Sequence, residues 1–327
     1  MSALGNLGSS MYEAHFGFRQ PPFALTPDTR FFFSQASHQD ALNTLLVALR
    51  GGEGFLKITG EVGLGKTQLC RQLLGALGPG FVTAYIPNPA LSPAALFRSV
   101  AEELGCQPPA ATAPEQMLKL ISHQLLANAE RGVRTVLVVD EAQALSDETL
   151  EAIRLLTNLE TETYKLLQVV LFGQPELDAR LAGRHLRQLR QRISFSHRLQ
   201  PLSPEDVRAY VRHRLEIAGA RNPALFTEGA LRVVYRASRG TPRLVNILCH
   251  KALLAAFGPG RAAVDRSEAI AAVDDTELSA GSKFWLHARE YAGALAFAVA
   301  IGLVAAYVLT SGAPSLLRLL NAGVSLP

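Results

Sequence analysis

A glycine-rich segment that ends in a lysine and a threonine carries the strongest chemical signal in the sequence. It follows the pattern G-x-x-x-x-G-K-T, between an apolar run at residues 55–59 that predicts a strand and residues 67–77 that predict a helix. Glycines allow backbone N–H groups to turn toward phosphate oxygens, and the positive end of the following helix adds to the field. We expect Lys66 to reach the β- and γ-phosphates of ATP and the Thr67 hydroxyl to bind Mg²⁺. The nucleotide-binding loop comprises Gly60, Glu61, Val62, Gly63, Leu64, Gly65, Lys66 and Thr67.

Two adjacent carboxylates follow a continuous apolar run at residues 135–139, which is typical of a strand buried on both faces of a parallel sheet. Ligands bind at the carboxyl edge of such sheets. We therefore expect Asp140 to hold Mg²⁺ and Glu141 to polarise the attacking water, a division that favours hydrolysis over transfer to a hydroxyl. For the pair taken alone, a solvated turn after the strand is the alternative.

Alternating strand and helix patterns predict an α/β fold in which helices sandwich a parallel sheet. Strands are expected at residues 55–59, 81–86, 135–139 and 166–172, with helices between them. No strand pattern follows Pro201. Ser203, Pro204 and two acidic residues predict a helix start, and further helical patterns up to residue 273 predict a small helical domain.

Composition narrows the class of protein further. The 327 residues are 48% hydrophobic and 18% charged, which excludes disorder as the default, and a net charge of +4 is too weak to indicate nucleic acid by itself. Cys70, Cys106 and Cys249 lack metal or disulfide spacing, so we expect buried thiols in a reducing compartment. The first ten residues do not resemble a signal peptide, which predicts a cytoplasmic main body.

The segment from Tyr291 to Leu309 contains neither charge nor proline. As a helix it would be about 28 Å long, close to the hydrocarbon thickness of a bilayer. A buried core helix is the alternative. Tyrosines near both ends, and Lys283 and Arg289 before the segment, favour one membrane span with the main body on the cytoplasmic side.

These features together resemble the ExeA family, also called general secretion pathway protein A, within the AAA+ ATPases. The chain is also similar to the MshM ATPase of pilus biogenesis and, more distantly, to transposition ATPases of the TniB type. The resemblance covers roughly residues 11–273. It depends on residues 12–23 (YEAHFGFRQPPF), the nucleotide-binding loop, residues 139–143 (VDEAQ), 171–177 (LFGQPEL), 191–193 (QRI) and 240–244 (GTPRL).

The resemblance implies roles for four further residues. Gln174 matches the sensor-one position, although Asn, Ser or Thr is more usual there, and would help to position the water. Arg243 matches the sensor-two arginine of the helical lid, which contacts the γ-phosphate; a surface arginine is the alternative. Arg192 best matches an arginine finger that reaches a neighbouring subunit's nucleotide, which would require a homo-oligomer. His38 is expected near the base.

Two other features leave alternatives open. The first is a run of six arginines without an acid, three of which, Arg180, Arg184 and Arg187, are spaced for one helical face. It fits a solvated basic face, a nucleic-acid contact or, at Arg192, the finger. The second is the aromatic opening of the chain, with Phe23 and the phenylalanines at residues 31–33, which fits either a cover for the sheet edge or a wall beside the adenine. The run comprises Arg180, Arg184, Arg187, Arg190, Arg192 and Arg198.

We interpret the chain as a single-pass inner-membrane ATPase whose cytoplasmic domain uses ATP and Mg²⁺ to drive assembly of an envelope secretion, pilus or exopolysaccharide export machine, with a protein partner in that membrane. Longer ExeA-type proteins carry a periplasmic peptidoglycan-binding domain, which is not expected in the short tail here. The alternative is an ATP-dependent oligomeric switch that binds DNA or proteins; a small-molecule kinase is disfavoured by Glu141. The expected parts are a lead-in (1–20), the AAA+ domain (21–201), the lid (202–275), a linker (276–290), the span (291–310) and a periplasmic tail (311–327).

Overall fold

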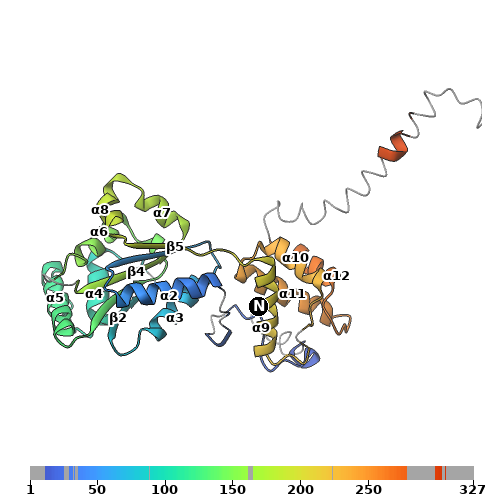
Figure 1. Cartoon of the computed structure of the whole chain (residues 1–327), viewed down its shortest axis with the longest axis horizontal. Helices are drawn as coiled ribbons and strands as arrows, with labels where there is room; N and C mark the ends of the chain where they lie inside the picture. The colour runs from blue at the N-terminus through green and yellow to red at the C-terminus, as the bar shows by residue number, and fades with distance from the viewer. Residues whose placement is uncertain are drawn as a thin grey trace, which may run out of the picture. The chain divides into compact units, whose positions relative to one another are not determined.

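The computed structural model of the protein describes most of its N-terminal five-sixths and a short piece near its C-terminus (Figure 1). All structural statements below concern these residues. They are residues 12–25, 29–31, 33, 36–87, 89–160, 165–222, 224–277, 299–303 and 306.

A five-stranded sheet in the order β2-β3-β4-β1-β5 organises the first part of the chain, and every strand pair in it is parallel. The central strands β3 and β4 are almost wholly buried, as their apolar runs predict. The predicted α/β fold with a parallel sheet is confirmed. The strands are β1 (Phe55–Thr59), β2 (Phe81–Ile86), β3 (Arg134–Val139), β4 (Leu167–Gly173) and β5 (Phe195–Arg198).

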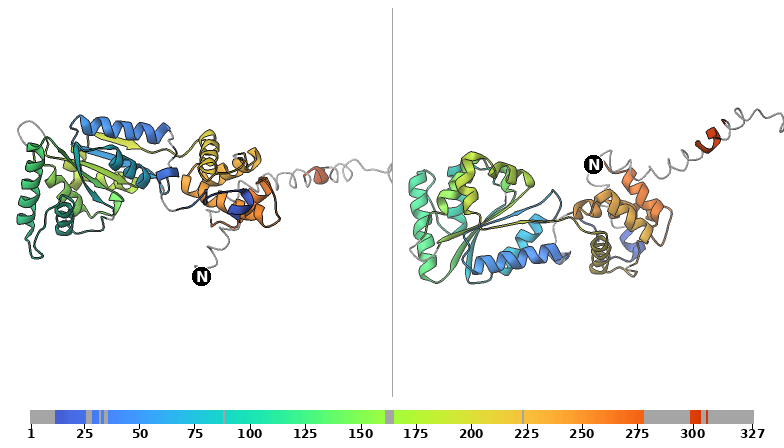
Figure 2. Two further views of the ribbon diagram at one scale, coloured as in Figure 1. Left: turned by 90° about the horizontal axis from the view of Figure 1, so that it is seen from below. Right: turned by 45° about the horizontal axis from the view of Figure 1, so that its top comes forward.

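Helices cover both faces of this sheet, and Figure 2 shows α2 and α5 on opposite sides of it. One core joins α2 and α3 to strand residues such as Ile58 and Val138, and the other joins α4–α8 to strand residues such as Leu137 and Val169. Successive side chains of a strand thus point into the two cores in turn. The elements around the sheet are η1 (Thr29–Phe31), α2 (Ala36–Arg50), α3 (Lys66–Ala76), α4 (Pro93–Glu103), α5 (Pro114–Glu130), η2 (Ala142–Ala144), α6 (Asp147–Leu156), α7 (Pro175–Leu181), η3 (Arg184–Leu186) and α8 (Arg187–Arg192).

A helical region follows the sheet, as the sequence predicts. Its first helix begins at Pro204 with a full capping box, in which Ser203 and Asp206 each bond the other's backbone N–H. Thr227 caps the second helix in the same region by accepting a bond from the Ala230 N–H. The region comprises α9 (Pro204–Ile217), α10 (Glu228–Ser238), α11 (Pro242–Phe257) and α12 (Arg266–Asp274).

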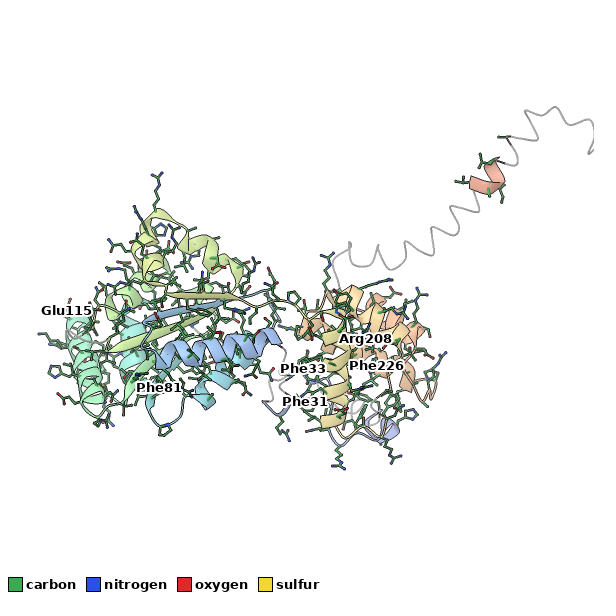
Figure 3. All side chains as sticks on the ribbon, in the orientation of Figure 1. Phe31, Phe33, Phe81, Glu115, Arg208 and Phe226 are labelled. Atoms are coloured by element: carbon green, nitrogen blue, oxygen red, sulfur yellow. The ribbon has the colours of Figure 1, made fainter. Side chains whose placement is uncertain are left out.

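The aromatic opening of the chain packs on this helical region. The Phe23 ring meets Phe226 edge to face with centroids 5.9 Å apart, and the Phe33 ring meets Tyr210 of α9 at 5.7 Å. Figure 3 labels Phe33 and Phe226 in this region. The Arg19 N–H donates to the carbonyl of Ala218, at the end of α9. The interpretation as a cover for the sheet edge is therefore wrong for these rings.

Two local expectations also differ from the structure. β5 was not predicted, because its side chains alternate between half-buried and exposed and form no apolar run. The three arginines expected on one helical face lie on three elements, with Arg180 on α7, Arg184 on η3 and Arg187 on α8. Gly183 separates the first from the other two. Arginine spacing predicts a shared helical face only where the helix is not interrupted by such a break.

The chain forms two compact units, residues 1–272 and 273–327. Of the expected membrane span, residues 299–303 and 306 are described and helical, while the remainder of Tyr291–Leu309 lies outside the described residues, as do most of the linker and all of the tail. No helix within the described part of the chain is long and apolar enough to cross a membrane. Cys70 and Cys249 are buried as expected, whereas Cys106 is only half-buried; all three are free thiols.

Candidate functional site

The nucleotide-binding loop connects β1 to α3, so its backbone faces the carboxyl edge of the sheet. Gly65 directly precedes α3 at a φ of 88°, and Gly63 has a φ of 83°, values that favour glycine. The Lys66 ammonium donates to the carbonyls of Gly60 (2.8 Å) and Glu61 (3.0 Å) within the same loop. The loop therefore already has the curled backbone that phosphate binding requires.

Several carboxylates lie close to the Lys66 ammonium of this loop. Burial lowers the pKa of Lys66, and the carboxylates of Glu141, Asp140, Glu61 and Glu176 partly oppose that shift. Burial raises the pKa of Asp140, against a hydrogen bond from the Thr67 hydroxyl and another from the Glu141 N–H. Asp140 is only 2% exposed. Thr67 and Asp140, the two expected metal ligands, are thus brought together.

Glu141 is held by its neighbours in an uncommon conformation. Its φ is 51°, a left-handed backbone that costs a non-glycine residue about 1 kcal/mol or more. Its Oε2 accepts from Nε2 of Gln143 (2.5 Å) and from Nε2 of Gln174 (3.2 Å). The Gln174 N–H in turn donates to Oε1 of Gln143 (3.0 Å). Two amides therefore fix the carboxylate expected to polarise water.

A cavity of about 320 Å³ adjoins these groups. Lys66, Thr67, Glu141 and Gln174 line it from the sheet side, and Arg243 lines it from α11. The Arg243 N–H donates to the Gly63 carbonyl (3.2 Å), and a Cβ on Gly63 would lie 2.7 Å from the Cβ of Arg243. The structure therefore brings the sensor-two candidate against the loop, and its contact with the γ-phosphate stays a prediction.

His38 lies on the other side of the loop. Its Nε2 is 2.7 Å from the Leu64 carbonyl, which fixes this nitrogen as the donor, and the side chain is 6% exposed. Burial, the largest cause, lowers the pKa of His38. His38 borders a smaller hollow of about 30 Å³ with Phe33 and Tyr210. Its contact in the structure is thus with the loop backbone, and a contact with the base stays a prediction.

Arg192 is apart from this cavity. Its Nη1 donates to the carbonyl (3.0 Å) and the hydroxyl (2.9 Å) of Thr157, which follows α6. It does not line the cavity that holds Lys66 and Arg243. Within one chain, Arg192 therefore does not reach the nucleotide cavity. The finger role would require contact with a second copy of the chain.

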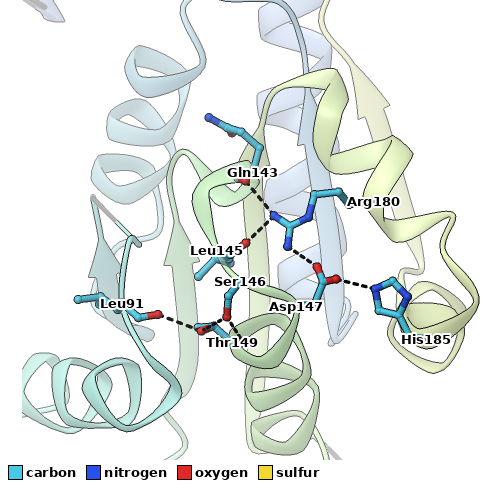
Figure 4. Close-up of polar contacts among 8 residues, drawn as sticks. All are labelled: Leu91, Gln143, Leu145, Ser146, Asp147, Thr149, Arg180 and His185. Atoms are coloured by element: carbon cyan, nitrogen blue, oxygen red, sulfur yellow. Dashed lines mark hydrogen bonds and ion pairs between the residues drawn. The ribbon is translucent and has the colours of Figure 1, made fainter.

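Arg180 has an internal role that its place in the basic run does not reveal (Figure 4). Its guanidinium donates to the carbonyls of Gln143 (2.9 Å) and Leu145, and forms an ion pair with Asp147 at the first turn of α6. Asp147 also accepts from Nε2 of His185 (2.7 Å). Arg180 thus holds the turn that carries Gln143.

Four residues at this site were not predicted. Gln143 belongs to a segment used for the resemblance, but no role follows from its place in the sequence. The other three line the cavity from the helical region. Apart from the bond between Arg214 and Tyr210 on α9, their hydrogen-bond partners lie far away in the chain. The four residues are Gln143, Tyr210, Arg214 and Asn246.

The sheet order, the loop after β1 and the carboxylates after β3 define a domain of the P-loop class. Residues 49–181 match the family model described as an AAA domain. Over 250 residues, 76% of this chain, it is 46% identical to General secretion pathway protein A of Aeromonas hydrophila, and the predicted relationship to that protein is confirmed. The aligned part spans about half of that relative, 46% of its length.

Solved structures of low sequence identity support the fold. The ORC2 protein of Aeropyrum pernix, in ADPNP-ADP complexes, matches with a TM-score of 0.60 at 16% identity, over 80% of this chain and 72% of that one. Cdc6p of Pyrobaculum aerophilum matches with a TM-score of 0.56 at 19% identity, over 73% of this chain and 68% of that one. At such identities the likeness concerns the fold alone.

Proposed function

We propose that the protein is a membrane-anchored, cytoplasmic AAA+ ATPase that hydrolyses ATP to drive assembly of an envelope secretion, pilus or exopolysaccharide export machine. The observation that carries the proposal is the convergence of Lys66, Glu141 and Arg243 at one cavity beside the nucleotide-binding loop, with the Asp140 carboxylate close enough to act on Lys66. The relationship to General secretion pathway protein A favours an envelope machine as the target.

The residues present fit a magnesium nucleotide. Thr67 and Asp140 already share a hydrogen bond and would bind Mg²⁺, directly or through water. No group of three or more acidic, histidine or cysteine side chains in the described ranges forms a metal site of its own. A cation held by one hydroxyl, one carboxylate and phosphate oxygens matches that donor set. When bound, Mg²⁺ would neutralise charge on the phosphates.

The proposed mechanism assigns one task to each remaining group. Lys66 would exchange its two loop carbonyls for phosphate oxygens, to which a cation binds more strongly. Glu141 would accept a hydrogen bond from the attacking water, with Gln174 and Gln143 fixing its orientation. Arg243 would contact the γ-phosphate and so couple hydrolysis to movement of the helical region. Arg192 would act in a neighbouring subunit.

Membrane anchoring is supported by the described part of the expected span. Val299, Ile301 and Leu303 are helical and more than half exposed to solvent, so they require an apolar cover that lipid would supply. We expect the full-length protein to resist extraction by alkaline carbonate, as an integral protein does, and a chain ending near residue 279 to be released. Equal release of both would contradict the anchor.

An ATP-dependent oligomeric switch that binds DNA or partner proteins is the second candidate. It is favoured by the exposed side chains of Arg184, Arg187 and Arg190, which lie close together in sequence after α7. Neutralising these arginines would lower a salt-dependent DNA affinity if this function is correct.

The ATPase site is tested by replacing Lys66 with alanine in the full-length protein. We expect kcat to fall by about 10²-fold or more, because a preorganised cation at the transferred phosphate is lost. Lys119→Ala, on the exposed face of α5, is the matched control and should keep wild-type activity. Steady-state phosphate release on membranes measures both. Undiminished activity in Lys66→Ala would contradict the assigned site.

A further inference from the structure

Arg214 of α9 is a buried cation without a carboxylate partner among the residues that the structure describes. Its side chain is 6% exposed. Its Nε donates to the Pro22 carbonyl (2.6 Å), Nη2 to the Ala24 carbonyl (3.3 Å) and Nη1 to the Tyr210 hydroxyl (2.8 Å). All three kinds of guanidinium nitrogen are thus bound, but only by neutral groups.

This arrangement leaves a positive charge to be balanced. Removing a guanidinium from water is costly unless a negative charge or several strong dipoles replace the solvent. The two carbonyls supply part of that replacement, and the Phe31 ring lies 4.7 Å from the guanidinium carbon and supplies another part. A full counter-charge is still absent, so a bound anion nearby would stabilise the buried state of Arg214 further.

Such an anion would bind in the cavity that Arg214 already lines. The same cavity is lined by Lys66 and Thr67 from the nucleotide-binding loop and by Ala24 and Leu25 from the N-terminal segment, residues 18–25. Arg214 therefore contributes to one wall and, through its bond to Ala24, holds another wall in place.

A hydrogen-bonded path also leads from Arg214 to the helix of the sensor-two candidate. The Tyr210 hydroxyl that accepts from Arg214 donates to Oδ1 of Asn246 (3.0 Å). Asn246 lies on α11, one turn after Arg243, and lines the cavity as well. The N-terminal segment, α9 and α11 are thus joined at the cavity by one network.

We propose that Arg214 couples occupancy of this cavity by a nucleoside polyphosphate to the seating of the N-terminal segment on the helical region. The inference rests on the proposed nucleotide site. Arg214 is buried when the segment is seated and becomes solvated when the segment leaves, so a nearby polyphosphate favours the seated state. By linkage, a seated segment raises the affinity for nucleotide by the same factor.

The test is hydrogen–deuterium exchange of the full-length protein with and without Mg²⁺ and AMP-PNP. In the wild type we expect AMP-PNP to slow exchange of the amides of residues 18–25 by about tenfold or more. Arg214→Met should reduce that protection below about twofold and weaken AMP-PNP binding by about tenfold. Arg212→Met, which removes an exposed arginine of the same helix, is the control and should behave as the wild type. If Arg214 had only a structural role, the amides of residues 18–25 would exchange at the same rate with and without nucleotide.

A second variant keeps the proposal falsifiable if Arg214→Met does not fold. Tyr210→Phe removes the hydroxyl that joins Arg214 to Asn246 and keeps the ring, and should reduce the protection of residues 18–25 about threefold. Protection that is equal in this variant and the wild type would overturn the inference. So would wild-type protein that binds AMP-PNP without any protection of residues 18–25. Failure of the wild type to bind AMP-PNP at all would instead overturn the nucleotide site, and the inference with it.

Discussion

At the scale of single residues, the orientation of Glu141 depends on amides from two different parts of the chain. Gln143 follows it by two residues, and Gln174 comes from the end of β4. Each donates to the same carboxylate oxygen, Oε2, which leaves the other oxygen to accept from a water. If these bonds were lost, the carboxylate would be free to take other staggered rotamers.

Gln143→Ala tests this arrangement. We expect kcat to fall by about tenfold to 10²-fold with little change in KM, because a misdirected base slows the chemical step and does not alter substrate binding. Gln188→Ala, at an exposed position of α8, is the control and should leave both constants unchanged. A rise in KM at constant kcat would contradict the role, and steady-state kinetics of both variants decides the matter.

The sequence predicted some site residues and missed others for a physical reason. The loop around Lys66 and the Asp140–Glu141 pair were predicted because their chemistry depends on neighbours in the sequence. The bond from His38 to the Leu64 carbonyl, 26 residues away, was not predicted. Arg214 bonds carbonyls about 190 residues away. Contacts of this kind form only when the chain folds.

At the scale of elements, the short helix α7 connects three parts of the site. Its N-cap is Gln174, beside Glu141. In its middle, Asp178 accepts from the Thr59 hydroxyl (2.9 Å) and forms an ion pair with Lys57, both on the strand that precedes the nucleotide-binding loop. Near its end, Arg180 holds the turn that carries Gln143. A displacement of α7 would therefore disturb both β1, which leads into the nucleotide-binding loop, and the turn that carries Gln143.

Arg180→Met tests the connection through α7. We expect the variant to lose about 1–3 kcal/mol of unfolding free energy, because two partly buried carbonyls lose their donor, and to lose several-fold in kcat. Since the Arg180 hydrogen bond holds the pKa of Asp147 below its ordinary value, the pair is present at neutral pH and weakens only as the pH falls below about 4. Denaturant unfolding at pH 7 therefore measures the full effect.

Two other arginines of the basic run provide the control for this experiment. Arg184→Met and Arg187→Met change exposed side chains and should alter the unfolding free energy by less than about 0.5 kcal/mol. If all three variants were equally stable and only DNA affinity changed, Arg180 would belong to a nucleic-acid surface and its role in holding the turn would be refuted.

Element prediction succeeded where apolar periodicity was strong. The bounds of β1 and β2 agree with the expected ones, and α9 begins where Ser203 and Pro204 predict. β5 was not predicted because an edge strand with one half-buried face has few apolar residues to indicate it. The break between α7 and α8 was not predicted, because arginine spacing alone does not indicate the turn at Gly183.

At the scale of the whole molecule, the parallel sheet brings distant segments to one edge. β1 lies between β4 and β5, and β3 lies beside β4, so the segments after β1, β3 and β4 meet although more than 100 residues separate the first from the last. Lys66, Glu141 and Gln174 each follow one of these strands. Arg192, the last residue of α8, lies outside that edge and bonds Thr157.

A second copy of the chain is therefore needed if Arg192 acts on nucleotide, and mixing of inactive variants tests this. Lys66→Ala and Arg192→Ala should each lose most activity in oligomers of one kind, because every active interface needs both residues. In an equal mixture, random assembly places an intact Lys66 opposite an intact Arg192 at about a quarter of the interfaces, so about a quarter of wild-type activity should return. Phosphate release measured after subunit exchange gives the result. Absence of recovery in mixed oligomers, or an active Arg192→Ala oligomer, would show that Arg192 does not act across the interface.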